Sequence, residues 1–230
     1  MPLIAITPDI VEPLAGKVRT QSSVRYVDAV ANAGGMPVVL APIEALIPEQ
    51  LKRFDGFVLT GGDDPRMEPF GGTTHPGTTS LHPRRQAYET ALIRALLAAP
   101  EIPVLGICLG MQMIALCAGG ELDQYLPDHL PSADQHRYDA VHPVEPRGET
   151  WLAPGSVTSY HKQAVRTCPS GFKVTAESPD QVIEAIEATD PRAAFCVGVQ
   201  WHPERTDDAN LGLGVLMRFV AAAARYGNSR

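Results

Sequence analysis

Residues 102–120 read IPVLGICLGMQMIALCAGG and decide the fold of this chain. Residues 104–107 form a short apolar run typical of a buried strand, whereas the apolar residues after Gly110 recur at helical spacing. Cys108 lies where the strand becomes the helix, between Gly106 and Gly110. A side chain presented on so sharp a turn needs neighbours without a Cβ, because strand and helix pass closely there. The stretch therefore predicts a turn that presents a cysteine nucleophile.

The position of Cys108 also favours its reactive form. A free cysteine titrates at about pH 8.5, and the unpaired N–H groups and dipole of a helix N-terminus stabilise the thiolate. Cysteine is also one of the most buried residue types, so most cysteines are structural. We expect that structural role for the three without a glycine bracket: Cys117, Cys168 and Cys196.

The elements before Cys108 alternate between strands and helices. Apolar runs at residues 3–7, 37–41 and 57–60 predict strands, Ser22 and Ser23 cap a helix between the first two, and a further helix is expected at residues 84–98. This alternation is typical of α/β proteins with a mostly parallel sheet covered by helices on both faces. Ligands bind at the carboxyl ends of such strands, where the Gly61–Gly62 pair and Cys108 both fall.

The second half has a different texture. Shorter stretches rich in β-formers predict strands that look like hairpins added to the sheet, and a terminal helix is expected at residues 209–226. The loop at residues 63–83 is long enough to be functional. The strand candidates are residues 137–144, 172–176, 182–188 and 195–201.

The composition of the chain limits the classes of protein to which it can belong. The 230 residues carry a net charge of −7, which argues against nucleic acid as a partner. The four cysteines have no C-x-x-C spacing, which indicates a reducing compartment and no zinc site. No signal peptide or membrane span is expected, so we predict a cytoplasmic protein without a membrane partner, folded as one domain over residues 1–230.

A cysteine nucleophile needs a base and a group that orients the base. The sequence GVQWHPE at residues 198–204 offers His202 and Glu204, and Pro203 restricts the histidine to an extended conformation. The alternative is that His202 is a surface or core histidine. No histidine pair has the H-E-x-x-H spacing of a metal site. Gly61 and Gly62 suit an oxyanion hole or, alternatively, a tight turn.

The motifs GICLGMQ and GVQWHPE, in this order, resemble those of class I glutamine amidotransferase domains over nearly the whole chain. The resemblance implies a flavodoxin-like three-layer fold and a triad of Cys108 as nucleophile, His202 as base and then acid, and Glu204 as its orienter. It implies Gly62 and Leu109 amides as the oxyanion hole. It also implies that TSYHKQAV, residues 158–165, is a loop that positions the substrate, and that Gly61 lies beside the oxyanion hole. The substrate-binding residues that it implies are Gly61, Gln112, Ser159, Tyr160 and His161.

Three further stretches are similar to the γ-glutamyl-γ-aminobutyrate hydrolase group, peptidase C26: LTGGDDPRMEPFG, RRQAYE and VIEAIEA. Arg85 and Glu89 in the second could instead form a surface ion pair, and the third could be an edge strand. The chain departs from the group at Leu109, at Lys162 and at Ala115–Leu116, where the group has arginine, histidine and asparagine–valine. The reaction class is unaffected, but the leaving amine is left open.

The resemblance implies a hydrolase that frees glutamate from a small γ-glutamyl amine through a thioester, as in putrescine catabolism, with no metal or organic cofactor. Two alternatives stay open: a glutaminase subunit that feeds ammonia to a separate synthetase, and a non-catalytic binding relative. A nucleotide-binding module has less support, because the only G-x-G of the chain, at residues 212–214, lies in the expected terminal helix. A homodimer is also open. Four charged residues near the expected cleft have two possible roles: they recognise the leaving amine, or they are solvated loop charges. They are Asp63, Asp64, Arg66 and Lys162.

Overall fold

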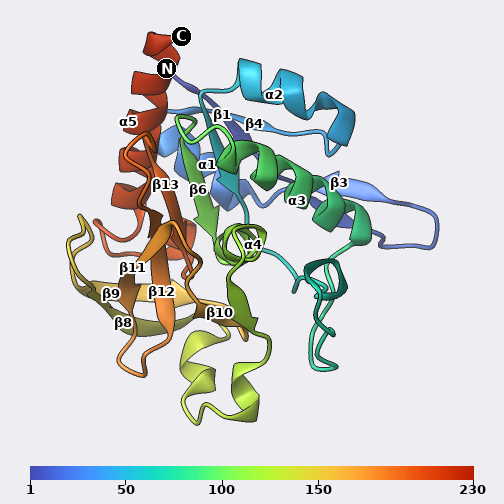
Figure 1. Ribbon diagram of the computed structural model, residues 1–230, viewed down its shortest axis with the longest axis vertical. Coiled ribbons are helices and arrows are strands. Elements are labelled where there is room, and N and C mark those ends of the chain that lie inside the picture. The colour runs from blue at the N-terminus through green and yellow to red at the C-terminus, as the bar shows by residue number, and fades with distance from the viewer.

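One eleven-stranded mixed sheet organises the protein, whose computed structural model describes residues 1–230 (Figure 1). Five neighbouring strands form its parallel half. In spatial order they are β4 (Met36–Val39), β1 (Leu3–Ile6), β5 (Gly56–Leu59), β6 (Val104–Ile107) and β13 (Cys196–Val199).

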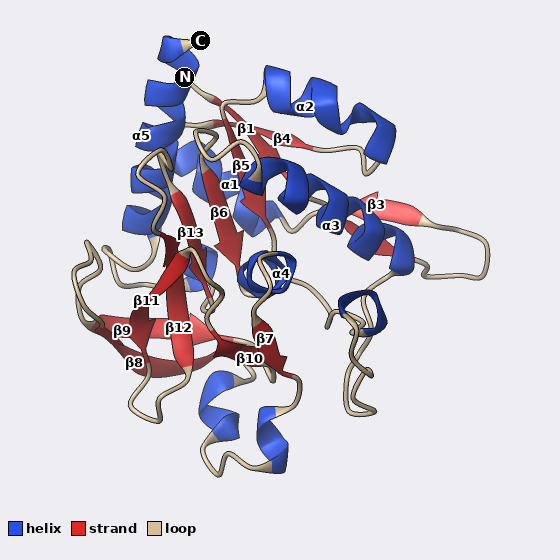
Figure 2. Ribbon diagram, in the orientation of Figure 1, coloured by secondary structure: helices blue, strands red, loops and turns tan.

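Helices cover both faces of the parallel half (Figure 2). Residues alternate between the two sides along each strand, so Phe57 of β5 packs into one apolar core and Val58 into the other. This burial on both faces explains why the strands read as continuous apolar runs. The predicted three-layer α/β fold is therefore confirmed. One layer holds α2 (Ile47–Arg53), α3 (Pro83–Leu97) and α4 (Leu109–Cys117), and the other holds α1 (Val24–Asn32) and α5 (Leu213–Ser229).

Antiparallel strands extend the sheet beyond β13. In spatial order they are β12 (Ile183–Ala188), β11 (Phe172–Glu177), β8 (Ala140–Pro146) and β9 (Gly155–Ser159), while β10 (Ala164–Thr167) pairs with β12 and with β7 (Glu121–Asp123). A separate hairpin joins β2 (Asp9–Val11) to β3 (Arg19–Gln21). Single 3₁₀ turns are η1 (Glu44–Leu46), η2 (Glu68–Phe70), η3 (Leu126–Asp128), η4 (Ala133–His136) and η5 (Pro203–Arg205).

Several sequence expectations need correction. β13 is parallel to β6 and belongs to the central strands, not to an added hairpin. β12 lies between β11 and β13 and is therefore not an edge strand. β8 begins at Ala140 instead of residue 137, because Tyr138 and Asp139 have φ angles of 60° and 59°, which no strand residue adopts. The terminal helix begins at Leu213, four residues later than expected.

The glycines around Cys108 allow the close packing that the sequence predicted. A Cβ on Gly110 would overlap the carbonyl oxygen of Leu59 in β5, and one on Gly106 would come within 2.7 Å of Ile114 Cδ1. Strand β6 and helix α4 can therefore pack as closely as they do only with glycine at both positions. None of the helices combines the length and apolar character needed to cross a bilayer.

Candidate active site

Three neighbouring parallel strands each end close to a residue that could take part in catalysis. Gly61 and Gly62 follow β5, Cys108 follows β6, and His202 follows β13. Since β6 pairs with both of the other strands, the sheet brings together segments that are far apart in sequence. The convergence at the carboxyl edge that was predicted for Gly61–Gly62 and Cys108 is observed.

Cys108 occupies a strained turn between β6 and α4. Its φ angle is 51° and its ψ angle −105°, outside the regions that residues with a Cβ ordinarily adopt. The turn is held because the Cys108 amide donates a hydrogen bond of 2.8 Å to the Val199 carbonyl. The thiol is buried, and it lies 3.9 Å from the Tyr160 carbonyl oxygen. Such strain at a buried nucleophile is typical of a catalytic elbow.

His202 is paired with Glu204 as the sequence predicted. The imidazole Nδ1 lies 2.7 Å from Glu204 Oε1, and both side chains are buried. A Cβ built on Gly61 would lie 3.0 Å from His202 Cε1 and 3.6 Å from Cys108 Cβ, so the imidazole and the cysteine flank this glycine. Burial alone would lower the pKa of His202, but the interactions with Cys108 and with the Glu204 carboxylate raise it to about 10. The imidazole is thus poised to exchange a proton beside the sulfur.

A buried arginine holds the Gly61–Gly62 turn. The Arg85 guanidinium donates to the carbonyl oxygens of Thr60 and Gly61 at 3.2 and 2.9 Å. It also forms a 2.9 Å ion pair with Glu89, and both side chains are fully buried. The interpretation of Arg85 and Glu89 as a surface pair is therefore wrong: the pair is buried and holds the backbone of the turn next to Cys108.

Two backbone amides at the site are available to a ligand. Gly62 lies outside any helix or strand and its amide makes no hydrogen bond within the protein. Leu109 is the first residue of α4, and amides in the first turn of a helix have no intrahelical partner. The Gly61 amide differs, because it donates a 3.0 Å hydrogen bond to the Tyr26 hydroxyl. Gly62 and Leu109 thus retain the donors that an oxyanion requires.

Cys108 opens into two polar cavities. The first has a volume of about 270 Å³, and the second, on the His202 side, of about 310 Å³; Cys108, Gly62, Asp63 and Tyr160 line both. The first is further lined by Asp64, Thr79, Gln112, Arg137, Tyr138, His161, Lys162 and Gln163. The second is further lined by Asp9, Gln21, Ser22, Ser23, Tyr26, Thr60, Gly61, His202 and Arg205.

Four of the five residues that the resemblance assigned to substrate binding line a cavity, and one does not. Gln112, Tyr160 and His161 line the first cavity, and Gly61 lines the second. The Ser159 side chain is fully buried, lies 2.7 Å from His142 Nε2, and is not among the lining residues.

The charged residues near the cleft also differ in whether they line a cavity. Asp63, Asp64 and Lys162 line the first cavity, whereas Arg66 lines neither cavity and its backbone bonds Gln86 instead. The Lys162 ammonium lies 3.0 Å from Asp64 Oδ2 and donates to the Gly77 carbonyl and the Thr79 hydroxyl. The long loop at residues 63–83 is thereby fastened to the segment that follows β9.

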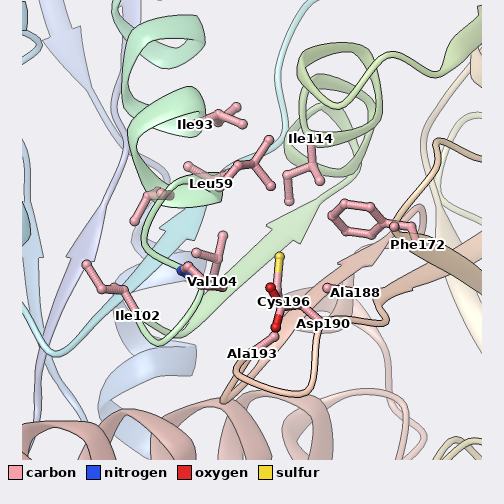
Figure 3. A pocket seen from close by; sticks show the side chains of 14 residues that line it. Leu59, Ile93, Ile102, Val104, Ile114, Phe172, Ala188, Asp190, Ala193 and Cys196 are labelled. Atoms are coloured by element: carbon pink, nitrogen blue, oxygen red, sulfur yellow. The ribbon is translucent and has the colours of Figure 1, made fainter.

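A third cavity, of about 190 Å³, lies away from Cys108 and is apolar (Figure 3). Side chains of the sheet and of α3 and α4 surround it, including Leu59, Ile93 and Ile114. Cys196 points into it, but burial raises the pKa of this thiol to about 12, and burial has the same effect on Cys117. These two thiols are therefore protonated at neutral pH and poor nucleophiles.

Comparison with known proteins identifies the family. Residues 2–204 match the Peptidase C26 family. The chain belongs to this family. Its membership makes the protein an amide hydrolase of the glutamine amidotransferase-like class.

Relatives within the family carry several names. A "Putative glutamine amidotransferase" of Mycobacterium tuberculosis is 36% identical over 87% of this chain and 67% of its own. "Protein NtpR" of Enterococcus hirae is 33% identical over 80% and 82%. The γ-glutamyl-γ-aminobutyrate hydrolase of Escherichia coli K12 is 30% identical over 78% and 77%.

A solved structure shares the fold. A "putative gmp synthase subunit a protein" from Thermoplasma acidophilum superposes with a TM-score of 0.68, 17% identity and coverage of 99% of this chain and 97% of its own. The likeness confirms the glutamine amidotransferase fold that the sequence motifs implied.

The pKa of His202 gives a direct test of the pairing. In a Cys108→Ala variant and in a Glu204→Gln variant, we expect this pKa to fall from about 10, because each change removes an anion that favours the imidazolium. Nitrogen-detected NMR titration of the ring measures the fall. Because the folded-state pKa exceeds the unfolded value, the stabilisation by His202 is complete below about pH 6.5 and is lost as pH rises through about 10. An unchanged pKa in both variants would show that neither anion contacts the ring.

Proposed function

We propose that this protein hydrolyses the γ-glutamyl amide bond of γ-glutamyl amines, γ-glutamyl-γ-aminobutyrate among them, and releases glutamate and an amine. The observation that carries the proposal is the strained Cys108 turn beside the buried His202–Glu204 pair, with two free backbone amides next to it. A cysteine, a base and an orienting carboxylate are the parts needed for covalent acyl transfer.

In the first half-reaction, the Cys108 thiolate attacks the side-chain amide carbon, a C–S bond forms, and the π electrons of the C=O bond move onto oxygen. The Gly62 and Leu109 amides stabilise this oxyanion, and each such donor contributes about 3 kcal/mol. His202 then donates its proton to the amide nitrogen, the C–N bond breaks, and the amine leaves. The product on the enzyme is a γ-glutamyl thioester of Cys108.

In the second half-reaction, neutral His202 removes a proton from water as the water oxygen attacks the thioester carbon. The tetrahedral intermediate collapses, the C–S bond breaks, and glutamate leaves while the thiolate is restored next to the protonated imidazole. Glu204 holds the ring through Nδ1 in both steps, so that Nε2 faces the reacting atoms. None of these steps uses a metal ion.

The first cavity suits the γ-glutamyl group. That group carries an α-ammonium and an α-carboxylate, and the lining offers both the Asp63 carboxylate and the Arg137 guanidinium. Burial, and then the nearby Asp9 and Asp64 carboxylates, raise the pKa of Asp63, so a bound ammonium would relieve this repulsion. We place the α-amino acid end of the substrate in this cavity.

The second cavity suits the leaving amine. His202, which must protonate the amine, lines this side of Cys108, together with Arg205 and the serines at positions 22 and 23. Arg205 is partly paired with Asp139, at 2.8 Å, and lies at a cavity wall where it can also meet an anionic group. An amine that itself bears a carboxylate, as γ-aminobutyrate does, would fit this lining.

A glutaminase subunit is the second candidate, favoured by Leu109 in the position where the hydrolase group has arginine. In this function glutamine occupies the first cavity, and ammonia is delivered to a separate synthetase. The two functions share the same thioester chemistry and differ in the leaving group.

A substrate panel tests the proposal. We expect release of glutamate from γ-glutamyl-γ-aminobutyrate and related γ-glutamyl amines with a kcat/KM above that for glutamine, because only the larger amines fill the second cavity. Glutamate formation is measured by a coupled dehydrogenase assay, with α-glutamyl amides as controls. Hydrolysis of glutamine alone would contradict the proposal in favour of the glutaminase. A panel without any turnover would also contradict the proposal, in favour of a glutaminase that depends on its synthetase partner or of a non-catalytic binding relative.

A further inference from the structure

Four buried side chains from four different segments meet in the antiparallel half of the protein. His136 comes from η4, His142 from β8, His161 from the segment after β9, and Glu184 from β12. All are less than 7% exposed, and one nitrogen or oxygen atom from each lies within 4.8 Å of those of the other three. We call these four residues the histidine cluster.

The outer nitrogen of each ring in the histidine cluster faces an acceptor. A carboxylate or a backbone carbonyl only accepts, so these three outer nitrogens carry hydrogen. In a neutral ring the inner nitrogen is then a lone pair directed into the cluster. The outer contacts are His136 Nε2 to Asp180 Oδ2 at 3.0 Å, His142 Nδ1 to the Pro143 carbonyl at 3.0 Å, and His161 Nδ1 to the Gln163 carbonyl at 2.9 Å.

The inner nitrogens all face Glu184. They lie 3.3 to 3.6 Å from Glu184 Oε1, yet neither oxygen of this carboxylate makes a hydrogen bond. The inner nitrogens of His136 and His161 likewise have no hydrogen-bond partner. Buried lone pairs that converge without a hydrogen are costly, so a cation at the centre of the cluster would satisfy the unpaired atoms of His136, His161 and Glu184.

We propose that the histidine cluster binds one divalent transition-metal ion, Zn²⁺, through His136 Nδ1, His142 Nε2, His161 Nε2 and Glu184. Three imidazoles and one carboxylate form a tetrahedral donor set of the type zinc prefers. The outer contacts fit as well, because histidine ligands of metals donate their second N–H to a carboxylate or a backbone carbonyl. All three rings do so.

Binding requires small adjustments. Ligand atoms about 2.0–2.1 Å from zinc lie about 3.4 Å apart, whereas the atoms of the cluster are separated by up to 4.8 Å, so the widest pair must approach by up to about 1.4 Å. The Ser159 hydroxyl, which now lies 2.7 Å from His142 Nε2, must turn away. Both changes involve side chains on adjacent segments and no rearrangement of the sheet.

The ion would cross-link four segments, one of which reaches the cleft. His161 lies next to Tyr160 and Lys162, which line the cavity at Cys108. The site is separate from the catalytic chemistry proposed above and supplies no step to it. Its role is to hold the segment at residues 159–163 in place.

The rival occupant is a proton. His136 lies between Asp180 and Glu184, and although burial alone would lower its pKa, the nearby Glu184 carboxylate and the hydrogen bond to Asp180 raise it. A protonated His136 could therefore satisfy Glu184 without any metal. Measurement of bound metal separates the two cases.

The test uses the full-length Cys108→Ala chain, because a free thiol beside His202 could itself bind zinc. The protein is purified without a histidine tag, stripped with a chelator, and dialysed against ZnSO₄ or CoCl₂. We expect about one zinc ion per chain by mass spectrometry, and visible cobalt bands of tetrahedral intensity without a thiolate charge-transfer band. Thermal unfolding should shift upward with zinc.

Variants locate the ion. Glu184→Gln and His142→Gln are expected to abolish stoichiometric binding, and Asp180→Asn to weaken zinc affinity about 10- to 100-fold, because Asp180 orients His136. His129→Gln is the matched control, since this exposed histidine also pairs with a carboxylate, Asp123, and should bind zinc as the parent does. Circular dichroism confirms that each variant is folded.

Two results would overturn the proposal. In the first, the Cys108→Ala chain takes up no zinc from a micromolar solution, which would show that the cluster is a proton-sharing network. This result does not depend on whether any cluster variant folds. Alternatively, zinc could bind equally to the parent and to folded Glu184→Gln and His142→Gln variants, which would place it elsewhere.

Discussion

Replacing Cys108 by alanine is expected to reduce glutamate release from the best γ-glutamyl substrate by about 10⁴-fold or more, the scale seen when a covalent nucleophile is removed. The sulfur is the only atom at the carboxyl edge of β6 that can form the thioester, and His202 alone cannot replace it. The loss should appear in kcat, because every other residue that lines the two cavities is unchanged. Steady-state assays with wild-type and variant protein at matched concentration measure the effect.

The control for this change is Cys117→Ala. Cys117 is the last residue of the same helix, and burial raises the pKa of its thiol to about 12, so its removal should leave kcat within about twofold. Turnover by Cys108→Ala at the wild-type rate would refute the mechanism. Equal losses in both variants would indicate damage to α4 and not removal of a nucleophile.

Replacing Arg85 by methionine is expected to give the largest loss of stability, about 3–5 kcal/mol, because breaking a buried ion pair leaves an uncompensated charge. The charge left behind is that of Glu89, whose side chain is fully buried. The variant also removes the hydrogen bonds to the Thr60 and Gly61 carbonyls. Urea unfolding followed by circular dichroism measures the change in the free energy of unfolding.

The double variant Arg85→Met/Glu89→Met should recover part of this stability, because no buried charge then remains. Arg84→Met is the positional control: this exposed neighbour bonds only the Pro42 carbonyl, so its loss should cost about 1 kcal/mol or less. A cost at Arg85 no larger than that at Arg84 would show that the pair is not a structural anchor. So would a double variant less stable than Arg85→Met.

The sequence was sufficient for the features that local rules encode. The glycine bracket around Cys108 gave the turn, the apolar runs gave the parallel strands, and the short GVQWHPE motif indicated the pairing of Glu204 with His202. Each of these depends on residues within a few positions of one another, where sterics and periodicity act directly.

What the sequence did not reveal depends on long-range contacts. The histidine cluster draws residues from positions 136 to 184 with no repeating spacing, so only the folded sheet brings them together. Arg85 looked like a surface residue because spacing says nothing about the hairpin and turn that cover it. The strands β2, β3, β7 and β10 are short and partly polar, and pairing with neighbours, not propensity, makes them strands.

The place of β13 has a further consequence for how the protein folds. It is the last strand along the chain, yet it lies between β6 and β12 and is the seam between the parallel and antiparallel halves. The two halves cannot become one sheet until this strand inserts, and such non-local pairing is slow to form. Since His202 follows β13, the proposed base reaches Cys108 in the same event. Folding intermediates that lack the seam therefore carry the thiol without its partner, and catalysis switches on only when the sheet closes.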